Sequence, residues 1–168
     1  MLAAALAYIE SNLPIFPLHY PTGNAGCSCR NETCDKIGKH PMTPHGLKDA
    51  TTDRQVVERW WTENPLANIG MPTGAASGLV AIDVDVRHQG VESLKVLERK
   101  IGALPPTLVS ITGGGFHYFY KYPGLIVRSG AAVLGPGIDV RGDGGYVVVP
   151  PSLHASGKRY EWIEGGNK

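Results

Sequence analysis

The chain has 168 residues, 22 of them glycine and 13 proline, and its formal net charge is +1. A hydrophobic content of 42% is too high for a disordered chain. The small net charge excludes polybasic binding to nucleic acid but leaves room for a local basic groove. The sequence has no apolar run of about 18 residues, so no membrane span is expected. Length predicts a single domain over residues 1–168, with a core that needs no disulfides.

The first half of the chain is predicted to contain two helices, a short strand and a long loop. Strong helix formers and an apolar face predict a helix over residues 2–12. A short apolar run at 15–20 predicts a strand. Residues 21–49 lose all periodicity and are expected to form a long loop, which in a compact domain needs a reason. A capping box, Thr52-x-x-Gln55, then opens a predicted helix over 53–64.

The second half is predicted to be mainly β. Alternating residues at 79–86 predict a strand, and a second amphipathic pattern predicts a helix over 90–101. Glycine and proline then separate further β segments, which we expect at 107–112, 116–122, 125–129, 137–142, 145–150 and 160–163. Because helices come early and most strands late, the order favours an α+β fold over a doubly wound sheet.

The strand at 79–86 carries two carboxylates. Successive side chains in a strand point to opposite faces, so Asp83 and Asp85 share one face. The other face is expected to be the core side, with Val80, Ile82, Val84 and Val86. Two carboxylates about 7 Å apart should repel each other and raise each other's pKa. A divalent cation such as Mg²⁺ or Mn²⁺ removes that penalty; the alternative is an exposed acidic face that Arg87 or a lysine compensates.

Two later segments add further polar groups. Asp139 and Arg141 lie at spacing two on a predicted strand, where an ordinary salt bridge is the alternative interpretation. A run of three glycines, Gly113-Gly114-Gly115, precedes His117 and would let a ligand lie against the backbone. Its alternative is a turn followed by a histidine packed among aromatic residues. Three carboxylates, one histidine and one arginine are together the inventory for phosphoryl transfer with two metal ions.

The predicted loop at 21–49 carries three thiols and an imidazole. Cys27, Cys29, Cys34 and His40 offer the Cys₃His set that closed zinc sites favour, and zinc would hold such a loop together. His45 is the competing fourth ligand. Exposed cysteines this dense would oxidise if they were unrelated. Their odd number argues against a secreted disulfide scaffold and favours a reducing cytoplasm.

The ordered motifs resemble the bifunctional DNA primase/polymerase family of the archaeo-eukaryotic primase superfamily. The resemblance rests on DVD at 83–85, GGxH at 114–117 and the run from IDVRGDGGY to PPS at 138–152. Upstream, GKHP at 38–41, the tryptophan pair at 60–61 and NIGMPTG at 68–74 follow the family's order. The match covers about residues 5–163. It implies a small N-terminal α/β part with a zinc-bearing loop, joined to an RRM-like sheet, with the active site between them.

The resemblance also implies roles for individual residues. Asp83, Asp85 and Asp139 would ligate two Mg²⁺ or Mn²⁺ ions, and His117 would contact the triphosphate. Arg141 is expected to contact phosphate because it lies beside Asp139. Many relatives carry Ser-x-His at the second motif, whereas this chain has Gly115-Phe116-His117. Backbone N–H groups of Gly114 and Gly115 are therefore expected to replace the serine hydroxyl. A zinc-bearing stem in relatives favours His40 as the fourth zinc ligand.

Other polar and aromatic residues have two interpretations each. Asp143 could be a fourth acidic participant, although Asp-Gly-Gly is more often a turn. Trp60 and Trp61 could stack on bases, but at least one is expected in the core. Asn68 could contact a nucleotide or hold a turn.

The predicted function is template-directed nucleotide transfer that extends or starts a primer. The expected partners are single-stranded DNA template, primer and nucleoside triphosphates, with no membrane. A helicase domain or protein is a candidate partner, because relatives often carry such segments downstream. This chain is then expected to be the N-terminal domain of a larger replication protein. The alternatives are a metal-dependent nuclease or phosphohydrolase and a non-catalytic zinc module that binds nucleic acid.

Overall fold

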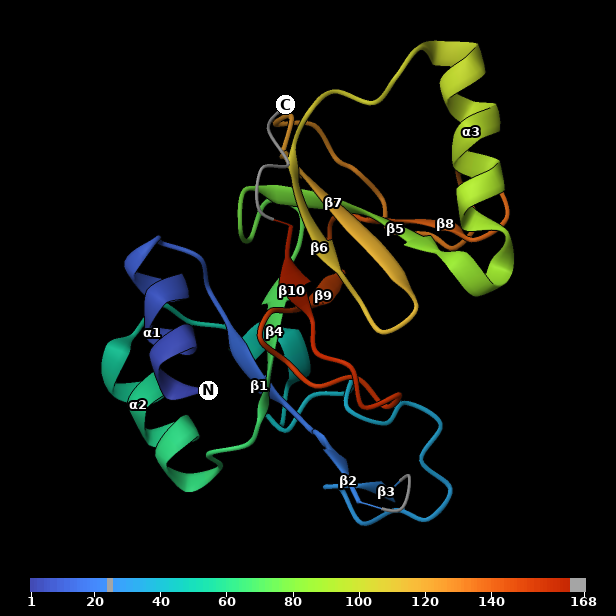
Figure 1. Ribbon diagram of the computed structural model, residues 1–168. Coiled ribbons are helices and arrows are strands. Elements are labelled where there is room, and N and C mark those ends of the chain that lie inside the picture. Colours follow the sequence, from blue (N-terminus) through green and yellow to red (C-terminus); the bar gives the residue numbers. More distant parts are fainter. Residues whose placement is uncertain (24–25, 164–168) are drawn as a thin grey trace. The chain divides into compact units, whose positions relative to one another are not determined.

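The computed structural model describes residues 1–23 and 26–163, and the chain divides into two compact units (Figure 1). The first unit contains Met1–Pro72 and Tyr146–Glu161. The second contains Thr73–Gly145 and the chain from Trp162 onward. Among the described residues, no helix is long and apolar enough to cross a membrane.

The first unit combines two helices with a small antiparallel sheet. Helices α1 (Leu2–Glu10) and α2 (Arg54–Glu63) pack against each other. The sheet has the order β1-β4-β9, from the strands Phe16–Leu18, Asn68–Pro72 and Tyr146–Val149. Two short strands, β2 (Pro21–Thr22) and β3 (Gly26–Cys27), pair separately, and a 3₁₀ turn, η1, spans Gly46–Asp49. The core holds Phe16, Leu18, Val148 and Tyr160, all buried.

The second unit is a five-stranded sheet with one helix packed against it. The order is β10-β6-β7-β5-β8, and the β6–β7, β7–β5 and β5–β8 pairs are antiparallel. The strands are Glu161–Trp162, Leu108–Ile111, Gly115–Lys121, Leu79–Asp85 and Ile138–Arg141. A 3₁₀ turn, η2 (Val86–His88), leads into α3 (Gly90–Ile101), which packs against β5 and β8 (Figure 1).

This architecture confirms the coarser part of the α+β prediction, a chain that mixes helices and strands, and the strand pairs described above are antiparallel. The bounds of α3 agree with the predicted helix, because the spacing of its apolar residues defines the apolar face and Gly102 defines the C-terminal end. The RRM-like arrangement and the placement of the active site stay predictions.

The predicted cap of α2 was wrong by one residue. Asp53, not Thr52, is the N-cap, and its carboxylate accepts hydrogen bonds from the backbone N–H groups of Gln55 (2.8 Å) and Val56 (3.2 Å). A carboxylate is as good a cap as a hydroxyl and adds a favourable interaction with the helix dipole.

Two strand predictions also need correction. Within the described residues, 125–129 form no strand, because Val127 N–H and C=O are both bonded to Asp143 rather than to a ladder. Conversely, NIGMP at 68–72 is the central strand β4, buried at all five positions. Its continuous burial removes the polar–apolar alternation by which a half-exposed strand is recognised.

The predicted core face of β5 holds only in part. Val84 is fully buried, but Val86 is 49% exposed. The strand ends at Asp85, whose carboxylate accepts a hydrogen bond from Arg87 N–H and so caps η2. Ala81, on the carboxylate face, is fully buried as well.

Candidate active site and metal centre

Four polar side chains lie in one row across the sheet of the second unit. The strand register places His117 of β7 opposite Asp83 of β5. It places Asp139 of β8 on the other side of Asp83, and Ser110 of β6 on the other side of His117. Directly opposed residues point to the same face of a sheet, so we call these four residues the cross-strand row. His117 and Ser110 are buried, whereas both carboxylates are half-buried.

A single arginine nitrogen joins the two carboxylates of the row. The Arg141 Nη2 atom donates to Asp139 Oδ2 at 2.8 Å and to Asp83 Oδ2 at 3.4 Å. The other oxygen of Asp83 lies 3.5 Å from His117 Nε2. The positively charged guanidinium group of Arg141 therefore lies between the two carboxylates, where a metal cation bound by both would also lie.

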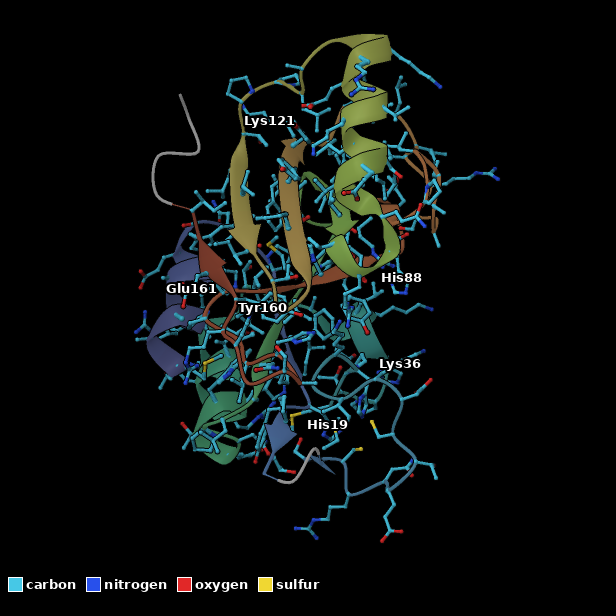
Figure 2. All side chains as sticks on the ribbon, turned by 45° about the vertical axis from the view of Figure 1, so that its right-hand side comes forward. His19, Lys36, His88, Lys121, Tyr160 and Glu161 are labelled. Atoms are coloured by element: carbon cyan, nitrogen blue, oxygen red, sulfur yellow. The ribbon has the colours of Figure 1, made fainter. Side chains whose placement is uncertain are left out.

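Asp85 shares the face of Asp83 but has different partners. Its carboxylate accepts hydrogen bonds from Arg87 Nε (3.1 Å) and Nη2 (2.9 Å), and lies 3.0 Å from His88 Nδ1. The Arg87 hydrogen bonds, with His88, hold the pKa of Asp85 well below its usual range. Mutual repulsion was expected to raise this pKa; that expectation was wrong because Arg87 offsets the negative charge. Figure 2 shows His88 at the turn that precedes α3.

Close contacts with neighbouring atoms account for the two glycines, Gly114 and Gly115, that precede Phe116 and His117. A Cβ on Gly115 would collide with the carbonyl oxygen of Val84, so only glycine lets β7 approach β5 here. A Cβ on Gly114 would lie 3.0 Å from the Nε atom of Arg87. A serine at position 115 would have no room in this structure.

Three other residues that the sequence analysis singled out have structural partners. Asp143 accepts hydrogen bonds from the backbone N–H groups of Ala75 and Val127, which lower its pKa. Asn68 is buried and is hydrogen-bonded to the backbone of Gly38 and Leu153. Trp61 is buried in the first unit, as predicted for at least one of the tryptophans.

The three thiols and His40 come together in the loop of the first unit. One donor atom from each of Cys27, Cys29, Cys34 and His40 lies within 4.8 Å of the others, and we call this set the thiol cluster. Across residues 1–23 and 26–163, no second group of three or more candidate ligands converges this closely. The carboxylates Asp83, Asp85 and Asp139 thus do not meet at one point as they stand.

The thiols of Cys27 and Cys34 change each other's pKa. Burial opposes ionisation of Cys27, but hydrogen bonds from the backbone N–H groups of Cys29 and Gly38 lower its pKa. Desolvation and the neighbouring thiols raise the pKa of Cys34 to about 11. Without a metal, ionisation of one thiol therefore opposes ionisation of the others. A divalent cation would remove this repulsion and allow several thiols to ionise.

Two histidines beside the cluster have different partners. His45, the competing fourth ligand, lies 2.9 Å from Asp49 and outside the cluster. The ring of His19 stacks on His40 with centroids 4.4 Å apart, while its Nδ1 atom is 2.8 Å from Ser28 Oγ. Figure 2 shows sulfur atoms near the His19 label. His19 is thus a supporting residue that the sequence analysis missed, because only stacking reveals it.

The sequence did not reveal the positions of two further residues: Ser110, which belongs to the cross-strand row, and Arg87, which was expected only as a compensating charge. The period of two within each strand shows which residues share a face. It shows which of them lie side by side only once the register between the strands is known.

Together these features define a mixed α/β protein that carries a row of half-buried carboxylates and a Cys₃His set suited to a metal ion. Comparison with family models matches residues 5–167 to the bifunctional DNA primase/polymerase family, N-terminal domain. The chain belongs to this family. Membership supports a nucleotidyltransferase of the DNA primase/polymerase type, which acts on DNA and nucleotides and uses divalent metal. The search of curated proteins found no match.

Proposed function

We propose that the chain catalyses template-directed addition of nucleotides to a primer, or starts one, on single-stranded DNA. The observation that carries the proposal is the convergence of Asp83 and Asp139 on one Arg141 nitrogen. It rests also on the family match over residues 5–167. Binding of template would depend on phosphate contacts and base stacking, because such an enzyme must accept every sequence.

The carboxylates fit divalent cations by their chemistry. Carboxylate oxygens are the ligands that Mg²⁺ and Mn²⁺ prefer, and Arg141 already places a positive group between Asp83 and Asp139. These two residues, with Asp85 on the same face, would hold two ions. When bound, the ions would lower the pKa of the attacking 3′-hydroxyl and stabilise the leaving pyrophosphate.

Arg141 and His117 would bind the triphosphate. Arg141 would exchange its carboxylate partners for phosphate oxygens, for which its planar group is well suited. His117 Nε2, which lies 3.5 Å from Asp83 Oδ1, would donate to the triphosphate. The Gly114 N–H group donates to Thr112 Oγ1 at 3.1 Å, so it would have to exchange this partner for a phosphate oxygen; the Gly115 N–H group is the second candidate contact.

The thiol cluster fits a structural zinc ion. Three sulfur donors and one imidazole nitrogen complete a tetrahedral set, and donor atoms within 4.8 Å of one another leave room for one ion. Zinc would stabilise a loop that has little regular secondary structure of its own.

Incorporation of labelled nucleotides tests the proposed function. The parent protein would be incubated with dNTPs or NTPs, with Mg²⁺ or Mn²⁺, with and without a primer. We expect metal-dependent extension of the primed template. Metal-dependent degradation of the DNA without incorporation would instead identify a nuclease, and binding without turnover would identify a non-catalytic module.

Replacement of His117 separates a phosphate contact from a packing role. We expect His117→Ala to raise the KM for the nucleotide at least about tenfold, the effect of losing one charge-assisted hydrogen bond of about 1.5 kcal/mol or more. The measurement is steady-state primer extension, with circular dichroism melting as a check of the fold. Unchanged nucleotide kinetics would refute the phosphate contact, even if the melting temperature fell.

A further inference from the structure

Ser110 is a fully buried polar residue in β6. Its hydroxyl forms no hydrogen bond to any described part of the chain. An unsatisfied buried hydroxyl destabilises the fold relative to one that is paired. An apolar residue would suit this position better if packing were its only role, because the side chain is fully buried.

The position of Ser110 connects it to the proposed site. It lies directly opposite His117 across the β6–β7 pair, on the side away from Asp83. Opposed side chains in an antiparallel pair have Cβ atoms about 4.5–5.5 Å apart. A rotation about the Cα–Cβ bond of a serine is therefore enough to bring its hydroxyl to a neighbouring imidazole.

The tautomer of His117 decides whether it can bind a phosphate while neutral. A neutral imidazole carries its proton on one nitrogen and accepts a hydrogen bond at the other. To donate to an oxygen of Asp83 or of a phosphate, Nε2 must carry the proton, and Nδ1 must be the acceptor. A hydroxyl that donates to Nδ1 favours this tautomer, as supporting hydrogen bonds do for metal-bound histidines.

We infer that Ser110 is a positioning residue for His117: its hydroxyl donates to Nδ1 and keeps the proton on Nε2, which faces the incoming nucleotide. The expected kinetic effect rests on the proposed function, but the tautomer of His117 can be measured in the free protein without any activity. Ser110 would not touch the nucleotide, because it is fully buried. It would act through His117 alone.

The test compares Ser110→Ala with Ser110→Thr, which keeps the hydroxyl on a residue suited to a strand. The first readout is the ¹⁵N chemical shift of the His117 ring nitrogens in the free protein. We expect the proton on Nε2 in the parent and in Ser110→Thr, and a mixture of tautomers in Ser110→Ala. The fold should survive, because Ser110→Ala keeps a small side chain in β6 and removes at most one hydrogen bond; the melting temperature should fall by a few degrees at most.

The second readout is the KM for the nucleotide in primer extension. We expect a rise of about three- to tenfold in Ser110→Ala, restoration in Ser110→Thr, and no further effect of Ser110→Ala when His117→Ala is already present. A parent without incorporation would overturn the proposed function, whereas the tautomer would still be decided by the chemical shifts. A tautomer that is the same in Ser110→Ala as in the parent would overturn the role of Ser110.

Discussion

Replacing both carboxylates of β5, in Asp83→Asn/Asp85→Asn, should abolish most nucleotide transfer while leaving the fold intact. The amides keep the size of the side chains but lose the charge that would hold divalent ions. Because such ions supply several kcal/mol of transition-state stabilisation, we expect incorporation to fall at least about 10²–10³-fold. Primer extension in Mn²⁺ measures the effect.

The stability of this variant has a definite expectation as well. Like-charge repulsion alone would make the double variant more stable than the parent. In the structure, however, Arg141 pairs with Asp83, and Arg87 pairs with Asp85. Removal of partly exposed ion pairs changes stability by about 0–1 kcal/mol each, so the melting temperature should change little or fall slightly. Stabilisation by added Mn²⁺ should disappear, because a ligand stabilises only the form that binds it.

A matched control is Glu63→Gln, the same chemical change at an exposed residue at the end of α2. It should extend primers like the parent and keep the response to Mn²⁺. Near-parental extension by Asp83→Asn/Asp85→Asn would place the metal site elsewhere and remove the main support for the proposed function.

Loss of a single cysteine from the thiol cluster should release zinc and lower stability strongly. We expect about one zinc ion per chain in freshly purified, reduced parent protein, and much less in Cys29→Ser. Because zinc binding to such a site is coupled to folding, the melting temperature of Cys29→Ser should fall by several degrees or more. Elemental analysis measures the zinc, and a chelator should lower the stability of the parent in the same way.

Glu32→Gln provides the control in the same loop, because Glu32 is exposed and outside the cluster. It should keep both the zinc and the melting temperature of the parent. Reduced parent protein without zinc would contradict the assignment, whatever the behaviour of Cys29→Ser.

Local patterns were sufficient wherever neighbours in sequence determine the structure. The spacing of apolar residues located α3, and the alternation in LVAIDVD located β5 and put Asp83 and Asp85 on one face. The spacing of the three cysteines and His40 also pointed to a common site, because a short loop can bring its own residues together.

Contacts between distant segments were beyond the reach of these patterns. The cross-strand row depends on the register of β6, β7, β5 and β8, which is set by packing over the whole sheet. The pairing of Asp85 with Arg87 depends on the end of β5 and on space above Gly114. β4 was missed for a similar reason: it is the central strand of its sheet, and burial at all five positions hides the alternation.

Mn²⁺ binding measured by electron paramagnetic resonance tests most directly whether the carboxylates of the sheet hold the metal. The zinc-loaded parent would be titrated with Mn²⁺ beside Asp139→Asn, with Glu63→Gln as the control. Asp139 and Asp83 share the Arg141 nitrogen, so loss of one of the two should weaken binding at least about tenfold, equivalent to about 1.4 kcal/mol. Equal Mn²⁺ affinity in Asp139→Asn and the parent would contradict a metal site at Asp83 and Asp139.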